Sequence, residues 1–143
     1  MEFEGKIWKD GKFWLVEVPS LNLMTQGKTR KEGLEMIRDA AIGLVECYFE
    51  SEIEDDFDII LIDYGSDTFG ITSNEDKLLL ALSLRRQREE SGSTVREAAS
   101  RLGSKSPNGY AQYEKGRTRI SLDQYEKLMR AVNPNRISIL RVI

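Results

Sequence analysis

The sequence has no histidine and a single cysteine, Cys47. Without histidine the chain can offer no imidazole as a zinc ligand or as an acid–base group. One cysteine allows no disulfide within the chain, which is typical of a protein of a reducing compartment, so we expect a cytoplasmic protein. With no histidine to activate it, Cys47 is expected to be a small core residue rather than a nucleophile.

Long apolar stretches are also missing. No run approaches the roughly 20 apolar residues that span a bilayer, and the first residues show no basic flank leading into an apolar run. We therefore expect neither a membrane partner nor a secretory signal. A length of 143 residues, with 40% hydrophobic and 31% charged residues, fits one ordinary domain or two small ones.

The net charge of −3 conceals two halves of opposite sign. Residues 1–73, the front half, contain 7 Lys and Arg against 16 Asp and Glu, a net charge of −9. Residues 74–143, the back half, contain 14 against 8, a net charge of +6. This polarity favours two domains with different partners: a basic partner for the acidic front half and a polyanionic partner for the basic back half. The alternative, that the charges only keep the protein soluble, stays open.

The front half is predicted to be an α+β domain in the order β-β-β-α-β-β. Strands are expected over residues 3–8, 13–18, 23–26, 57–64 and 68–72. Turns with Gly11 and Gly65 follow the first and fourth of them, and Pro19 ends the second. Thr29 and Glu32 form a capping box that begins a helix. The apolar residues that follow at spacings of three and four predict its buried stripe: Leu34, Ile37, Ala41, Leu44 and Tyr48. One helix on an antiparallel-rich sheet is therefore expected.

The back half is predicted to be all-α. Helices are expected over residues 76–90, 94–102, 107–115 and 121–132, and three of them are followed by glycine, at Gly92, Gly103 and Gly116. Four short helices with a tight glycine-containing turn between the second and third have helix-turn-helix spacing. The short tail over residues 136–143 has the alternation of a strand but no predicted partner.

Three segments of the back half resemble the phage-repressor (Cro/C1, or Xre-type) family. They are residues 84–90 (Leu-Arg-Arg-Gln-Arg-Glu-Glu), 94–103 (Thr-Val-Arg-Glu-Ala-Ala-Ser-Arg-Leu-Gly) and 112–117 (Gln-Tyr-Glu-Lys-Gly-Arg). The segment between Gly103 and Tyr113 is one residue longer than usual in the family. The resemblance implies binding to double-stranded operator DNA by a homodimer or a higher even-numbered homo-oligomer, because such proteins read two half-sites.

The third helix of the back half carries the candidate base-reading residues. Asn108 and Gln112 lie four apart on one helical face, and a side-chain amide can read adenine through a donor and an acceptor. Ser106 is a third base-reading candidate, at the helix N-terminus, where a phosphate can also bind. The candidate phosphate-binding residues are Thr94, Arg96, Lys105, Lys115, Arg117 and Arg119. A helical bundle that uses a basic face for protein contacts is the alternative.

The front half resembles the HicB-type antitoxins. Residues 17–21 (Glu-Val-Pro-Ser-Leu) and 25–29 (Thr-Gln-Gly-Lys-Thr), followed by the capped helix, are similar to the strand, loop and helix of that family. The sequence departs from the family at Ser20 (usually acidic), at residues 22–23 (usually Pro-Gly) and at Gly33 (usually Ala). The resemblance implies a partial ribonuclease-H-like domain that neutralises a small basic ribonuclease toxin, HicA, in a protein that represses its own operon.

The acidic run after the helix is the candidate toxin-binding surface: Glu52, Glu54, Asp55, Asp56 and Asp58. A two-metal nuclease site needs several carboxylates that converge. Of the carboxylates near the strand predicted over residues 57–64, only Asp63 lies well inside it, so a solvated acidic surface is favoured over such a site. We expect no enzyme activity, no catalytic residue, no metal and no cofactor. The alternative function is a stand-alone helix-turn-helix regulator whose α+β domain senses a ligand or dimerises.

Overall fold

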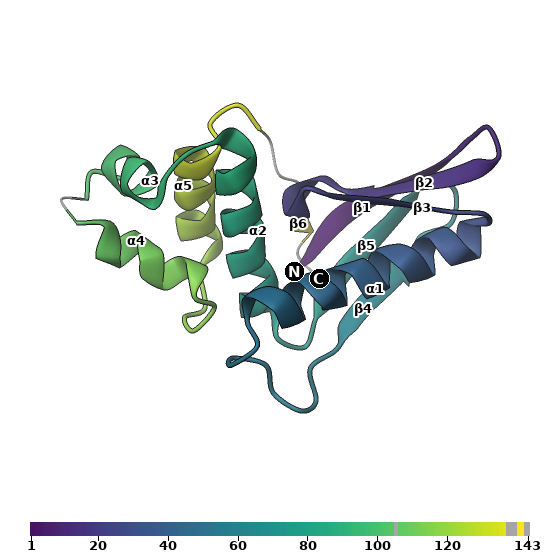
Figure 1. The fold of residues 1–143 in the computed structure, drawn as a ribbon, viewed down its shortest axis with the longest axis horizontal. Coiled ribbons are helices and arrows are strands. Elements are labelled where there is room, and N and C mark those ends of the chain that lie inside the picture. Colours follow the sequence, from purple (N-terminus) through teal and green to yellow (C-terminus); the bar gives the residue numbers. More distant parts are fainter. Residues whose placement is uncertain (105, 137–139, 142–143) are drawn as a thin grey trace.

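The computed structural model describes residues 1–104, 106–136 and 140–141. Figure 1 shows an elongated molecule with a sheet and one long helix on one side and short helices on the other. The elements are β1 (Glu2–Asp10), β2 (Phe13–Val18), η1 (Pro19–Leu21), β3 (Leu23–Gly27), α1 (Arg30–Tyr48), β4 (Ile59–Asp63), β5 (Thr68–Ser73), α2 (Asp76–Ser91), α3 (Val95–Arg101), α4 (Pro107–Glu114), α5 (Leu122–Val132) and β6 (Leu140–Arg141). The predicted class, an α+β front half followed by helices, is confirmed.

The sheet is antiparallel and β1 lies at its centre. The strand order is β3-β2-β1-β5-β4, and β6 also pairs with β1. The tail after the helices, whose alternation suggested a strand without a partner, contributes β6, so the back half is all-α only up to that tail. Phe3 is fully buried and pairs with Leu140, which packs against the same core, so this part of the tail adds a strand to the front sheet. Residues 137–139 and 142–143 of the tail lie outside the described part of the chain.

Helix α1 begins where its capping signal predicts. The Thr29 hydroxyl accepts a hydrogen bond from the Glu32 N–H at 3.1 Å, whereas the Glu32 carboxylate accepts from the Lys28 N–H at 2.9 Å rather than from Thr29. The buried stripe is displaced from the predicted one: Ile37 and Ala41 are buried as expected, but the predicted Leu34, Leu44 and Tyr48 are only half-buried. Its fully buried members are Gly33, Ile37, Ala41 and Val45.

Glycine at position 33 is explained by the close approach of α1 to the sheet. A Cβ atom built on Gly33 would lie 2.8 Å from Cγ2 of Val16, and one built on Gly27 would lie 2.4 Å from the Gly33 nitrogen.

Cys47 is exposed, which corrects the expectation of a core residue. The reason is the displaced stripe, because Val45 takes the position facing the sheet near the end of the helix.

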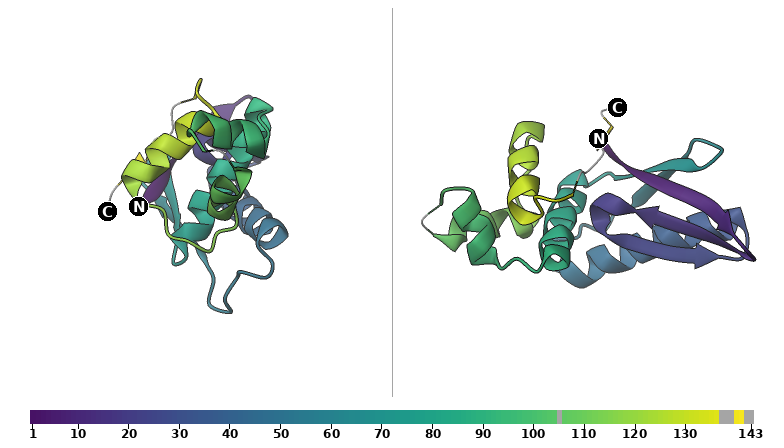
Figure 2. Two further views of the ribbon diagram at one scale, coloured as in Figure 1. Left: turned by 90° about the vertical axis from the view of Figure 1, so that its left-hand side faces the viewer. Right: turned by 90° about the horizontal axis from the view of Figure 1, so that it is seen from above.

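Helix α2 lies between the two halves (Figures 1 and 2) and has buried residues all around it. Arg86 donates hydrogen bonds to the carbonyl oxygens of Leu21 and Asn22 at 3.0 and 2.6 Å, and Gln87 donates to that of Pro19 at 2.8 Å. The apolar core is one continuous cluster that includes residues of both halves. The predicted domain boundary, at residues 73/74, lies immediately before this shared helix.

Candidate nucleic-acid interface

Helices α3 and α4 form the predicted helix-turn-helix pair. Thr94 begins α3 with a complete capping box, in which its hydroxyl accepts from the Glu97 N–H and the Glu97 carboxylate accepts from the Thr94 N–H. Gly103 follows α3 with a φ angle of +79°, a left-handed conformation that glycine adopts without a steric penalty. Ser106 then caps α4 by accepting a hydrogen bond from the Asn108 N–H at 3.3 Å.

The two faces of α4 differ in character. Tyr110 and Glu114 are buried against the rest of the helical half, whereas Asn108 and Gln112 are exposed on the opposite face. The structure therefore brings the two predicted base-reading amides together on the outward surface, at the end of the molecule where α3 and α4 lie (Figure 1). Ser106 is exposed beside them at the helix N-terminus.

A buried ion pair fixes the orientation of α4. The Arg88 guanidinium of α2 makes a bidentate contact with the Glu114 carboxylate, at 2.7 and 2.9 Å, and also donates to the Ser93 carbonyl oxygen. Only 15% of the Arg88 side chain and 9% of the Glu114 side chain are exposed. Burial, with Glu114 nearby, raises the pKa of Tyr110 above its ordinary value, so its phenol stays neutral. The two residues are 26 positions apart and leave no local signal in the sequence, so this pair was not predicted.

The predicted phosphate-binding residues divide into two groups. Thr94, Arg96 and Lys115 are exposed, and Lys105 lies outside the described residues. The other two, Arg117 and Arg119, already contact carboxylates. Arg117 Nε lies 2.9 Å from Glu52 Oε1, and Arg119 Nη2 lies 3.1 Å from Asp76 Oδ2.

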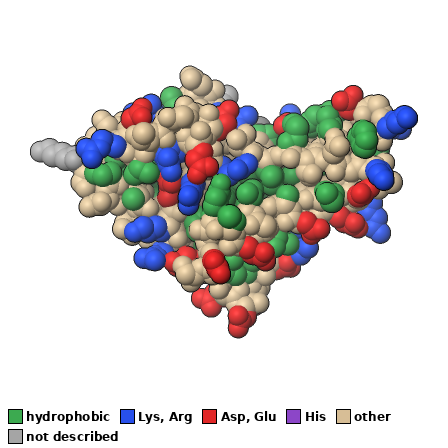
Figure 3. Space-filling view, viewed as in Figure 1, with side chains coloured by type: hydrophobic (Ala, Val, Ile, Leu, Met, Phe, Trp, Pro, Cys, Tyr) green, Lys and Arg blue, Asp and Glu red, His purple; other side chains and the backbone are tan. Residues whose placement is uncertain are grey.

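The predicted toxin-binding residues lie in the loop between α1 and β4, residues 49–58, which we call the acidic loop. In Figure 3, Asp and Glu side chains gather along the lower margin of the molecule, whereas Lys and Arg lie over the helices at the left and at the right-hand end. Glu54 and Asp55 line a hollow of about 510 Å³ together with half-buried Ile53 and Phe57. Asp56 is exposed nearby.

The remaining two residues of the predicted set have partners inside the molecule. Asp58 forms an ion pair with Arg38 at 2.5 Å, and Glu52 is the carboxylate that contacts Arg117. The structure therefore leaves Glu54, Asp55 and Asp56 as the more accessible part of the predicted surface.

Asp63, the strand carboxylate considered for a metal site, is paired with Arg30. Both oxygen atoms of Asp63 accept hydrogen bonds from the guanidinium at 2.7 Å, and one also accepts from the Gly65 N–H at 2.8 Å. The hydrogen bond from Arg30 is the largest reason why the pKa of Asp63 is lowered to about 2. Across residues 1–104, 106–136 and 140–141, no group of three or more Cys, Asp and Glu side chains is arranged to bind a metal ion.

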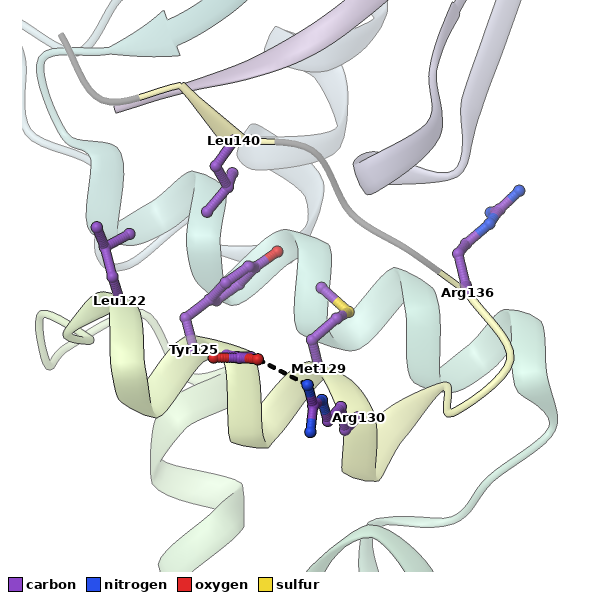
Figure 4. Close-up of a pocket in the computed structure, with 7 residues that line it drawn as sticks. Leu122, Tyr125, Met129, Arg130, Arg136 and Leu140 are labelled. Carbon is purple, nitrogen blue, oxygen red and sulfur yellow. Dashed lines mark hydrogen bonds and ion pairs between the residues drawn. The ribbon is translucent and has the colours of Figure 1, made fainter.

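A second hollow, of about 410 Å³, lies between α5 and β6 (Figure 4). Leu122, Tyr125 and Met129 point from α5 toward Leu140, and Arg136 lies at one end. Glu126 also lines the hollow and forms an ion pair with Arg130, and the hollow belongs mainly to the back half. The ligand-sensing alternative places a cavity in the α+β domain, where the hollow beside the acidic loop is instead lined largely by carboxylates.

Comparison with known families agrees with this geometry. Residues 79–133 match the model of a family described as a helix-turn-helix domain, and a comparison with curated proteins found no match. Among the helices in the described ranges, none is both long and apolar enough to cross a membrane. The chain therefore carries a helix-turn-helix domain over residues 79–133, which makes it a candidate DNA-binding regulator.

Proposed function

We propose that the protein is an antitoxin that represses its own operon by reading operator DNA with α4 and neutralises a small basic ribonuclease with its front half. The observation that carries the DNA part is the outward face of α4. It presents the amides of Asn108 and Gln112, with the cation of Lys115 at its end, on a helix that the Arg88–Glu114 pair orients.

Recognition follows from the chemistry of these side chains. In helix-turn-helix complexes the second helix enters the major groove, where an amide can donate to N6 and accept toward N7 of adenine, or read another base edge less specifically. Lys115 and Arg96 supply phosphate contacts, which add affinity without sequence information. Two copies of the chain would read two half-sites, so a homodimer or a larger even-numbered assembly is part of the proposal.

The toxin part requires no catalytic residue. A basic ribonuclease binds RNA through a cationic surface, and a net charge of −9 in the front half is complementary to such a surface. Glu54 and Asp55 line the same hollow as the apolar side chains of Ile53 and Phe57, so the acidic loop offers both charge and apolar contact area. Charge complementarity of this kind mainly raises the association rate. The resemblance of residues 17–21 and 25–29 to HicB-type antitoxins supports the same assignment.

The DNA part is tested with the full chain and DNA from upstream of its own gene. Asn108→Ala and Gln112→Ala are each expected to lose about 1–3 kcal/mol of binding free energy on the operator and little on random DNA. Gln26→Ala, which removes the same amide group from an exposed position on β3, is the matched control and should bind both duplexes like the wild type. Equal losses on operator and random DNA for the two α4 variants would move base reading to other residues.

The toxin part is tested by titrating the full chain against the small basic product of a neighbouring gene in an RNA-cleavage assay. Protection at a stoichiometric ratio is expected, and reversing the charge of Glu54, Asp55 and Asp56 should slow association, more at low salt than at high salt. The control reverses three exposed carboxylates outside the acidic loop: Glu35, Asp39 and Asp67. Unprotected RNA in the presence of excess folded wild-type chain would contradict the antitoxin assignment.

The second candidate is a stand-alone regulator. The hollow between α5 and β6 is the feature that favours ligand sensing, although it belongs mainly to the back half. Leu122, Met129 and Leu140 line it with Arg136, whereas Arg130 is paired with Glu126 at 2.8 Å. Normal operator binding by a chain that gives no protection against the ribonuclease would leave this candidate standing.

A further inference from the structure

The two arginines that follow α4 are each placed against a carboxylate from outside the helix-turn-helix pair. Glu52 comes from the acidic loop and Asp76 from the first turn of α2. The carboxylate side chains are mostly enclosed, with 23% of Glu52 and 19% of Asp76 exposed, whereas 60% of Arg117 is exposed. A guanidinium in this position is accessible to a second anion while it contacts the first.

The Arg117–Glu52 contact is built on packed backbone rather than on two freely moving side chains. The Glu52 N–H donates to the carbonyl oxygen of Phe49 at 2.9 Å, which fixes the turn that presents Glu52. Phe49 is buried, and Gly116 packs directly on it and on Leu78. A Cβ atom on Gly116 would lie 2.8 Å from Leu78 Cδ2 and 3.3 Å from the Phe49 ring, and the φ angle of Gly116 is +72°. The residue before Arg117 is therefore docked on the start of the acidic loop.

We propose that Glu52 competes with DNA phosphate for Arg117, so that the acidic loop restrains the DNA affinity of the protein. The proposal rests on the proposed DNA binding. Carboxylate and phosphate are alternative partners for the same guanidinium donors. Glu52 Oε1 lies 2.9 Å from Arg117 Nε, so a phosphate that binds the same guanidinium comes close to a second anion. DNA binding must therefore either break the Arg117–Glu52 ion pair or place both anions on one guanidinium. Part of the favourable contact with DNA is offset in this way.

Glu52→Gln in the full chain removes the competing charge and keeps the shape of the side chain. If DNA binding must break an exposed ion pair, the dissociation constant for DNA is raised by a factor of about 1.5 to 5. We expect Glu52→Gln to bind a labelled duplex of random sequence more tightly by this factor, since phosphate contacts do not depend on sequence. The gain should be larger at low salt than at high salt.

The matched control is Glu50→Gln, which makes the same chemical change at an exposed position two residues away. It measures the effect of one less negative charge in the acidic loop without the contact to Arg117. A second comparison places Glu52→Gln in an Arg117→Ala background, where its gain should fall to that of Glu50→Gln. Fluorescence anisotropy gives the dissociation constants of the wild type, the three single variants and the double variant, and circular dichroism verifies that each is folded.

The proposal is overturned if Glu52→Gln gains no more than Glu50→Gln, or if it gains as much without Arg117 as with it. In both cases the wild type still binds DNA, so the proposed function stands. A wild-type chain that binds neither the random duplex nor DNA from its own promoter would overturn the DNA-binding function and this inference together.

Discussion

Breaking the Arg88–Glu114 ion pair should destabilise the protein far more than breaking an exposed pair. Glu114→Gln leaves the Arg88 guanidinium, with only 15% of its side chain exposed, without its bidentate carboxylate. Removing one partner of a buried pair costs about 3–5 kcal/mol, because the other charge stays desolvated and uncompensated. Arg88→Met, which leaves the Glu114 carboxylate buried, should cost a similar amount.

Replacing both partners by apolar residues of similar size should recover most of this loss. In the double variant Arg88→Met/Glu114→Leu no charge is left buried, and such replacements are neutral or stabilising in other proteins. The exposed pair of Arg130 and Glu126 on α5 provides the control, with 77% and 64% of these side chains exposed. Glu126→Gln should change the free energy of unfolding by no more than about 0.5 kcal/mol.

Equilibrium unfolding in urea measures these differences. Because one apolar core includes both halves, we expect a single transition, detected alike by tryptophan fluorescence and by far-UV circular dichroism. A cost of Glu114→Gln no larger than that of Glu126→Gln would contradict this prediction, since the pair would then be screened by solvent. A double variant as unstable as the single ones would also contradict it, since packing rather than charge would then dominate.

Two further predictions concern the front half. Gly33→Ala should lower the free energy of unfolding by about 1–2 kcal/mol, because the new methyl group meets Val16 at 2.8 Å; Gly43→Ala, in open space on the same helix, should raise it by about 0.5–1 kcal/mol. Asp63→Asn should cost at most about 1 kcal/mol at neutral pH, since 42% of the Asp63 side chain is exposed. The pKa of Asp63 is lowered from 3.8 to about 2 in the folded state, so its contribution is present above pH 4 and lost as the pH falls toward 2. Urea unfolding of wild type and variant at several pH values checks this, and a difference that stays constant down to pH 2 would contradict it.

The elements that the sequence predicted well are those with signals inside a few residues. Thr29, Thr94 and Ser121 cap α1, α3 and α5 through hydroxyl groups that accept from backbone N–H groups three residues later. Gly92 ends α2 in the left-handed conformation that its position suggested. The outward placement of Asn108 and Gln112 followed from helical periodicity once the start of α4 was known, and their role in base reading stays a prediction.

What the sequence could not supply are contacts between distant residues. Arg117 was predicted to face phosphate because of its charge and position, but Glu52, which it contacts, lies 65 residues earlier. The strand at Leu140 has a recognisable alternation, yet nothing local indicates that its partner is Phe3. Gly33 stood out in the sequence only as a departure from the HicB-type pattern, whereas its role depends on Val16 in a strand that must first be placed beside the helix.

The central position of β1 has a consequence for the order in which the protein is made. Phe3 pairs with Ile71 and with Leu140, so it is synthesised well before two of the residues that it contacts. At typical rates of synthesis the second of them follows on the order of ten seconds later. Strands β1, β2 and β3 can form an antiparallel meander early. Phe3, which is fully buried in the folded protein, stays accessible during that interval. Because long loops must close before these contacts form, folding should be slow for a protein of this size, and the nascent chain should be open to chaperones.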